Sequence, residues 1–538
     1  MDNNILKVKE QRVATPCLTS NKAPTWNAIF LAAASGVLLF LSFPKYGSGY
    51  LSWIALIPLF WAVRGTISVR QGLLLGFITG MVFHIGLIYW ITYVIVNYGY
   101  LPIYLGIIIM LLLASYLSLY IAVFTAGIVF FRQKIALYFT APVLWICLEY
   151  GKSYLLTGFP WENLGYSQYL NHYLVQFADV SGVFGLSFLI VLVNATFCEV
   201  IFKKSKKEFI FAAAVILIIA GILIYGVNRS KQIDIVLQNA AGIEVSLIQG
   251  NIEQSVKWND GFQKETIDIY EHLSLQKAPA KGSLIVWPET ALPFNYQDVN
   301  NFQKQVRDIS VKTKSWFIFG STSYDKLKAD TDYYNSAYLL SPDGEVKGRY
   351  DKVHLVPYGE YVPLRNIFPF IKKLTAGMGD FSSGTGYHPL TVDNKKIGIL
   401  ICYEGILPLA ARSYKKEGAE LLVNITNDAW FGATSAPFQH FSMAVFRAVE
   451  TRLYLVRAAN TGISAVVDPQ GRIIAQTNIF EKASLKENVK YSSIQTIYIQ
   501  YGDILVIVCF LLVVFYFIFV LLKGRIRNAG RKYTGNGK

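Results

Sequence analysis

Three residues of this chain have side chains that could together transfer an acyl group, and two of them directly follow an apolar, strand-like run. Glu289 ends the string Val-Trp-Pro-Glu, and Cys402 ends the string Ile-Leu-Ile-Cys. Lys352 lies between them in the sequence, in an otherwise apolar segment limited by Pro357. Proteins with α/β folds place their sites where strands end. The pattern therefore indicates a candidate site with a carboxylate, an ammonium and a thiol.

These groups are a complete set for acyl transfer through a thioester. A free thiol is mostly protonated at neutral pH, so a nearby carboxylate has to take its proton as general base. A lysine ammonium stabilises the thiolate and the oxyanion, with the backbone N–H of Tyr403 as a second donor. Each residue alone is more often a cap, a solvated charge or a core thiol, and spacing does not show that the three meet.

The cysteine placement singles out Cys402. The chain has five cysteines, and the other four lie in the N-terminal tail or within apolar runs: Cys17, Cys147, Cys198 and Cys509. Cys402 thus has no disulfide partner in the polar half of the chain, and no cysteine–histidine spacing indicates zinc.

The composition indicates a membrane protein with more than one domain. The chain has 538 residues, of which 53% are hydrophobic and only 16% charged, and such values are typical of proteins partly in lipid. A span needs about 20 apolar residues. We expect a membrane domain over 26–227 with seven spans, and an eighth span at 503–522. The seven are 26–44, 49–64, 72–97, 101–131, 136–154, 174–202 and 208–227.

The net charge of +15 could indicate nucleic acid, but the positions of the basic residues indicate membrane topology instead. Lysine and arginine gather before the first span, after the second, fourth and sixth, and after the eighth. The positive-inside rule then predicts a cytoplasmic tail at 1–25 and a basic cytoplasmic tail at 523–538. Because an odd number of spans precedes it, segment 228–500 is expected on the outer side. No nucleic-acid partner is expected.

Segment 228–500 has the pattern of an α/β domain. Its strand-like runs are nearly continuous in apolar residues, which is typical of sheets covered on both faces. We expect strands at 242–249, 283–287, 315–320, 335–341, 397–402, 420–426, 463–468 and 471–476, and helices at 260–276, 298–313 and 437–452.

The order of the motifs WPET, KVHLVPYGEYVP and CYE resembles that of the carbon–nitrogen hydrolase (nitrilase) superfamily. Longer strings resemble its apolipoprotein N-acyltransferase branch: Gln249-Gly250-Asn251-Ile252, Lys257-Trp258, the run from Asn427 to Gly432, Gln439-His440, and the run from Arg457 to Ser464. The likeness covers 240–480 and, with the flanking spans, nearly the whole chain. It implies a multi-span α-helical membrane domain of about eight helices and an extracytoplasmic αββα sandwich.

The resemblance assigns roles to matching positions. It makes Glu289 the general base, Lys352 the oxyanion-stabilising lysine and Cys402 the nucleophile. Positions that support the site or bind substrate follow: Glu360 as a second essential glutamate, Trp258, Tyr403 and Glu404 at the site or its entrance, and Trp430 and Phe431 on an arm that meets lipid. Simple core packing accounts equally well for Trp430 and Phe431. Departures at Gly405 and over 433–437 leave the shape of the acceptor side open.

The resemblance also implies a reaction and a location. Cys402 is expected to take a fatty acyl chain from a phospholipid, phosphatidylethanolamine being the expected donor, and to pass it to the α-amine of a diacylglyceryl-cysteine. That cysteine is the N-terminus of an apolipoprotein, and the transfer is the final step of lipoprotein maturation. No metal or organic cofactor is expected. The expected location is the bacterial inner membrane, with the catalytic domain in the periplasm and both termini in the cytoplasm.

Two other functions fit parts of the sequence. A membrane-tethered amidase or nitrilase would use the same triad on a soluble substrate, although one span would suffice as a tether. A transporter or receptor with a non-catalytic outer domain is the second alternative. The intact triad positions argue against it, as does the small number of charged residues expected within the spans.

Overall fold

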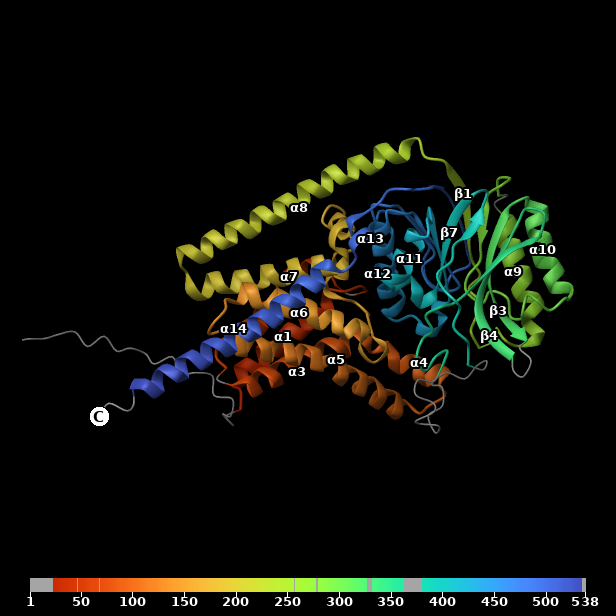
Figure 1. Ribbon diagram of the computed structural model, residues 1–538. Coiled ribbons are helices and arrows are strands. Elements are labelled where there is room, and N and C mark those ends of the chain that lie inside the picture. Colours follow the sequence, from red (N-terminus) through yellow and green to blue (C-terminus); the bar gives the residue numbers. More distant parts are fainter. Residues whose placement is uncertain are drawn as a thin grey trace, which may run out of the picture.

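A bundle of apolar helices and an α/β sandwich lie side by side in the protein (Figure 1). This computed structural model describes residues 23–45, 47–66, 68–255, 257–276, 279–326, 331–361 and 380–534. Residues 1–22 of the expected N-terminal tail, and 535–538 of the expected C-terminal tail, lie outside the described residues, as do Pro363 and the residue before it in the GEYVP string.

The helices of the bundle follow the apolar runs of the sequence. They are α1 (Trp26–Leu41), η1 (Gly49–Trp53) with α2 (Ile57–Arg64), α3 (Val69–Ile88), α4 (Trp90–Tyr98), α5 (Ile103–Phe131), α6 (Leu137–Tyr154), α7 (Ala178–Lys203), α8 (Lys206–Gln238) and, after the sandwich, α14 (Ile504–Thr534). Within the described ranges, four helical segments are long and apolar enough to cross a membrane: Val69–Ile88, Ile103–Phe131, Val175–Lys203 and Lys206–Gln238. Shorter apolar helices lie at Trp26–Leu41, Gly49–Arg64 and Ile504–Val520. The helical membrane domain is thus confirmed, while the number of spans remains a prediction.

Two helices differ from the expected spans. The third expected span is interrupted at Tyr89, between α3 and α4. Helix α8 continues past 227 to Gln238, so the helix includes a polar second half as well as the expected apolar span. Tyr225 and Arg229 on α8 contact Asp179 at the start of α7, at 2.7 and 2.9 Å. The chain therefore leaves the apolar zone as a helix and enters the sandwich at β1.

The sandwich contains two six-stranded sheets. The first sheet has the order β12 (Ala483–Lys490), β1 (Gly242–Gln249), β2 (Leu284–Val286), β3 (Trp316–Lys326), β4 (Thr331–Leu340) and β5 (Val346–Asp351). The second has the order β11 (Ile473–Gln476), β10 (Ala465–Val467), β9 (Leu455–Ala459), β8 (Leu421–Thr426), β7 (Lys395–Ile401) and β6 (Leu390–Val392). In each sheet three central strands are parallel, β1–β2–β3 and β7–β8–β9.

Helices cover the outer face of each sheet (Figure 1). α9 (Gln263–Gln276) and α10 (Asn301–Thr313) pack on the first sheet, and α11 (Pro408–Lys416) and α12 (Ala436–Thr451) lie on the second. A shared core joins the inner faces, with Leu247 and Ile318 from one sheet and Ile399 from the other. This arrangement confirms the αββα sandwich, and it explains why the strands read as nearly continuous apolar runs.

Helix α12 joins the two halves of the protein. Its Ala444, Val445 and Ala448 belong to the core of the sandwich, whereas Met443 and Phe446 belong to the core of the helical bundle. A helix that is buried on all sides has to be apolar or have its polar groups paired. The polar side chains of α12 are paired with groups of both halves, and one of these groups belongs to Cys402.

Candidate active site

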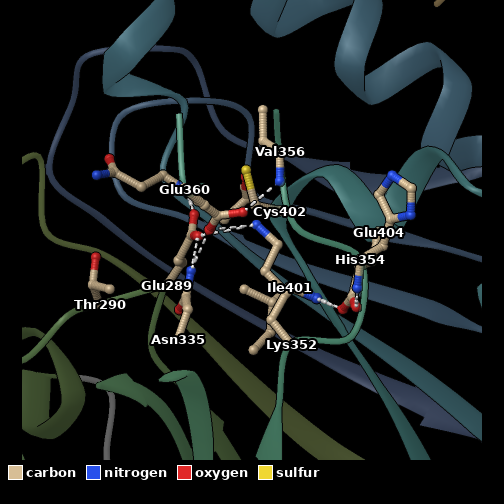
Figure 2. Close-up of polar contacts among 12 residues, drawn as sticks. Glu289, Thr290, Asn335, Lys352, His354, Val356, Glu360, Ile401, Cys402 and Glu404 are labelled. Carbon is tan, nitrogen blue, oxygen red and sulfur yellow. Dashed lines mark hydrogen bonds and ion pairs between the residues drawn. The ribbon is translucent and has the colours of Figure 1, made fainter. Parts of the chain in front are cut away.

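The structure brings the three predicted residues together. Glu289 follows β2, Lys352 follows β5 and Cys402 follows β7, so the first sheet supplies the charged groups and the second sheet the thiol. Figure 2 shows the side chains of Cys402, Lys352 and Glu289 gathered in one place, with Glu360 beside them.

Hydrogen bonds fix the orientation of both carboxylates. Lys352 Nζ lies 2.9 Å from Glu360 Oε1 but 3.8 Å from Glu289 Oε1. Asn335 Nδ2 donates to both, at 2.8 Å to Glu289 and 3.0 Å to Glu360. The backbone N–H of Asn427 donates to the second oxygen of Glu289 at 2.9 Å. Glu289 is therefore oriented from two sides, and Lys352 is bound more closely by Glu360 than by the candidate base.

The electrostatics of the site favour a neutral thiol next to a carboxylate base. Burial raises the pKa of Cys402, the charge of Glu289 raises it further, and Lys352 opposes both effects. Burial also raises the pKa of Glu289 above its ordinary value, against the charge of Lys352. For Lys352, burial alone would lower the pKa, but the charges of Glu360, Cys402 and Glu289 raise it overall. The thiol thus keeps its proton until a base removes it, and Lys352 stays charged.

The backbone at Cys402 has a conformation that a non-glycine residue seldom adopts. Its φ is 53°, in the left-handed region. His440 Nε2 lies 3.3 Å from the Cys402 carbonyl oxygen, and this contact is a hydrogen bond in the forms of the ring that carry a proton on Nε2. In a planar trans peptide the N–H of Tyr403 points opposite to that carbonyl. This geometry supports the prediction that Tyr403 N–H is an oxyanion donor.

Glu404 makes hydrogen bonds to backbone groups on both sides of the candidate site, and its predicted place at the site or its entrance stays a prediction. Its carboxylate is fully buried and accepts backbone N–H groups of Val353, His354 and Ile401 at 2.8, 3.0 and 2.9 Å. The Tyr350 hydroxyl donates to it as well, at 2.9 Å. Figure 2 shows the bonds from His354 and Ile401 to Glu404 on the side of Lys352 away from Glu289 and Glu360. Glu404 therefore ties the segment after Lys352 to the turn of Cys402.

Tyr403 lies in a stack of aromatic rings that crosses between the two halves. Its ring is near parallel to that of His354, at 5.8 Å between centroids, and to that of Trp161, at 6.4 Å. Trp161 belongs to the loop between α6 and α7. The residue after the candidate nucleophile thus packs on the membrane half of the chain.

The predicted arm contacts aromatic residues of the bundle. The ring of Phe431 meets Trp90 edge-on at 5.0 Å and Trp161 at 5.9 Å, and Trp430 meets Tyr98 at 4.9 Å. By contrast, Trp258 is 39% exposed on the loop after β1. A role for the arm in contacting lipid, and for Trp258 at the entrance, remains a prediction.

Sequence reasoning missed Asn335, and it gave His440 no role although the residue stood in a quoted motif. Asn335 is a buried polar residue at the start of an otherwise apolar strand segment, which is a weak signal for a site. His440 pairs with Asp428, 2.9 Å away through Nδ1, and this pairing was not visible in the spacing.

The bundle also buries more charge than the sequence indicated. His84, Glu149, Lys152 and Glu162 line a cavity of about 40 Å³ between the helices, and all four are at most 8% exposed. The number of buried charges therefore does not distinguish this bundle from that of a transporter, whereas the residues gathered at Cys402 do.

Comparisons with known proteins place this architecture in a class and then in a family. The model described as Carbon-nitrogen hydrolase matches residues 244–498, so the sandwich is a domain of that class attached to membrane helices. The model described as Apolipoprotein N-acyltransferase N-terminal domain matches residues 35–196.

Relatives cover almost the whole chain. The apolipoprotein N-acyltransferase of Geobacter metallireducens is 44% identical over 91% of this chain and 95% of its own. That of Rickettsia prowazekii is 34% identical over 70% of this chain and 75% of its own. A solved carbon–nitrogen hydrolase of Helicobacter pylori is 20% identical with a TM-score of 0.35, and covers 46% of this chain and 89% of its own. The chain belongs to the apolipoprotein N-acyltransferase family, as its motifs indicated, and it is an enzyme of that family.

Proposed function

We propose that the protein transfers a fatty acyl chain from phosphatidylethanolamine, through a thioester on Cys402, to the α-amine of the N-terminal diacylglyceryl-cysteine of an apolipoprotein. The observation that carries this proposal is the convergence of Glu289, Lys352 and Cys402 beside aromatic residues of the membrane half. Both substrates reside in the bilayer, and membership of the family supports the same reaction.

In the first half-reaction Glu289 takes the proton of the Cys402 thiol as the sulfur attacks the ester carbonyl of the phospholipid. Lys352 and the N–H of Tyr403 stabilise the oxyanion. When the tetrahedral intermediate collapses, the ester C–O bond breaks and Glu289 returns the proton to the departing lysophospholipid oxygen. The acyl group is then a thioester on Cys402.

In the second half-reaction the neutral α-amine of the acceptor attacks the thioester carbonyl. Glu289 takes one proton from the attacking nitrogen, the C–S bond breaks, and the proton passes to the sulfur. The products are an amide and the free thiol. The rings of Tyr403, Trp161 and Phe431 pack together next to the nucleophile, and such apolar surroundings make water a poor competitor of the amine.

We also propose that the catalytic domain lies on the outer side of the inner membrane, in the periplasm, with both termini in the cytoplasm. The alternation of basic residues between the apolar runs supports this orientation. Cysteine accessibility to a membrane-impermeant reagent tests it, using single cysteines placed at Val299, which is 91% exposed on the sandwich, and in the tail after α14.

The catalytic proposal is tested by incubating purified protein with phosphatidylethanolamine vesicles and searching for a fatty acyl adduct on Cys402 by mass spectrometry. We expect the adduct in wild-type protein and in Cys509→Ala, a control in helix α14, and no adduct in Cys402→Ala. A diacylated lipopeptide should then discharge the adduct and gain the acyl chain. Absence of any adduct, with the lipopeptide unmodified, would refute the transferase. An adduct that only water discharges would favour the hydrolase alternative.

A further inference from the structure

A second buried lysine approaches the candidate base from outside the triad. Lys257 lies on the loop after β1, and its side chain is 1% exposed. Its ammonium donates to Thr290 Oγ1 at 2.8 Å and to the backbone carbonyl of Glu289 at 3.4 Å. Thr290 lies on the side of Glu289 away from Lys352 in Figure 2. Lys257 therefore reaches the base from the side opposite Lys352.

Within the part of the chain that the structure describes, no carboxylate pairs directly with Lys257. Among the described residues none of the acidic oxygens lies within 4.0 Å of its nitrogen, and an unpaired buried ammonium is costly. Burial lowers the pKa of Lys257 to about 8, while the charge of Glu289 opposes that shift. Such a charge persists in a fold when something nearby depends on it.

The balance of charges at the site shows which group the Lys257 ammonium compensates. Glu289 is a buried carboxylate and Glu360 a partly buried one, with 14% of its side chain exposed, whereas the triad supplies one ammonium. The ammonium of Lys352 is 2.9 Å from Glu360 and 3.8 Å from Glu289. Its positive charge therefore compensates the charge of Glu360 more than that of Glu289. With Lys257 the cluster has two negative and two positive groups, and the additional positive charge lies next to the base. The charge of Lys257 lowers the pKa of Glu289, against the effect of burial.

Lys257 also holds the backbone beside the base. Thr290 has φ 43°, which is unfavourable for a β-branched residue. Its backbone lies against Gly320 so closely that a Cβ on that glycine would be 2.4 Å from the Thr290 nitrogen. The hydrogen bond from Lys257 to Thr290 Oγ1 stabilises this turn.

We propose that Lys257 is an electrostatic positioning residue that keeps Glu289 ionised as the base for thiol deprotonation and holds the Glu289–Thr290 turn. The proposal rests on the proposed acyl transfer. Lys257 would act in two ways, through its charge on Glu289 and through its hydrogen bond to Thr290. Different substitutions remove these two effects.

The test measures the rate of acyl-enzyme formation on Cys402 against pH, in the full-length protein with phosphatidylethanolamine vesicles. Lys257→Gln keeps a donor for Thr290 but loses the charge, so the pKa of Glu289 rises. The acid limb of the profile should move to higher pH by about one unit, which is about tenfold slower acylation on the acid side, with recovery at alkaline pH. Lys257→Arg keeps the charge and should restore the position of the limb.

Thr290→Val is the matched variant, because it removes the hydrogen bond and retains the charge. It should slow acylation to a similar extent at every pH without moving the limb. An acid limb of Lys257→Gln that coincides with that of wild type, or a uniform slowing at all pH, would overturn the proposal. Thermal unfolding of each variant identifies any that fail to fold. If Lys257→Gln is among them, the position of the acid limb in Lys257→Arg tests the proposal. If wild-type protein forms no adduct at any pH, the proposed function fails instead.

Discussion

Replacing Glu404 by glutamine should separate a structural role for this residue from a role in lining the site. Its carboxylate accepts three backbone N–H groups and one hydroxyl. One oxygen serves Val353 and His354, and the other serves Ile401. A glutamine has only one acceptor oxygen, so its NH₂ group has to face at least one of these donors.

The magnitude follows from the orientation that costs least. With the NH₂ group toward Ile401, a single backbone N–H loses its acceptor, at about 1–3 kcal/mol, and the remaining bonds become neutral ones, each weaker by up to about 1 kcal/mol. Avoiding a buried charge offsets part of this, which leaves about 2–3 kcal/mol. Because Ile401 precedes Cys402, the loss loosens the turn of the nucleophile. If the whole loss fell on the transition state, acylation would slow by about 30- to 160-fold, and this is the upper limit of the expected effect.

The assay pairs the rate of adduct formation on Cys402 with thermal unfolding in detergent. Glu404→Gln should lower both the rate and the melting temperature, with no change in the phospholipid concentration that gives half the maximal rate. Glu345→Gln, at a glutamate whose side chain is 68% exposed, is the matched control and should change neither. A Glu404→Gln variant with normal melting and rate but a raised half-saturating concentration would refute the reasoning, because the carboxylate would then contact substrate.

Three other outcomes follow from the site. The rate of acylation should fall as pH drops through a value above the ordinary pKa range of glutamate. Burial raises the pKa of Glu289, and only the ionised carboxylate accepts the thiol proton. A rate that does not change with pH in quench-flow measurements would contradict this. Glu360→Gln should slow acylation about tenfold or more without unfolding, since Lys352 would move from its 2.9 Å contact toward Glu289 and weaken the base; adduct kinetics and melting together measure it. His440→Leu should slow acylation about tenfold by removing the contact of the ring with the Cys402 carbonyl. His440→Gln should recover much of that rate, and equal rates for the two variants would exclude a positioning role.

The sequence predicted β2 and β7, which precede Glu289 and Cys402, but not β5, which precedes Lys352, or the edge strand β12. β2, β7 and β8 are buried parallel strands, and buried parallel strands read as continuous apolar runs. β12 (Ala483–Lys490) is an edge strand of polar sequence that pairs antiparallel with β1, and its pattern contained no apolar run to recognise. Helix α11 has only nine residues, too few for a clear helical period.

The order of the family motifs, more than the residue types at strand ends, predicted the candidate triad, whereas its supporting residues depend on long-range packing. Asn335 and Glu289 are 46 positions apart in the sequence, and nothing local connects them. The hydrogen bonds of Glu404 depend on a local turn that the sequence does not show. The left-handed backbone at Cys402 reverses the chain direction, so a glutamate two residues after the nucleophile points back beneath β7. A motif gives the order of residues along the chain, but not such a turn.

Helix α12 couples the candidate active site of the sandwich to the membrane domain. On α12, Gln439 Oε1 accepts from Trp90 and Trp161 at 3.2 and 2.8 Å, and the next residue, His440, contacts the carbonyl of Cys402. The aromatic side chains from the bundle and the backbone of the nucleophile are thus positioned by adjacent residues of a single buried element. A soluble hydrolase on a tether would need no such coupling, because its site would be complete without the bundle. An enzyme whose acyl donor arrives from the bilayer does need it, because the membrane helices then form one wall of the site.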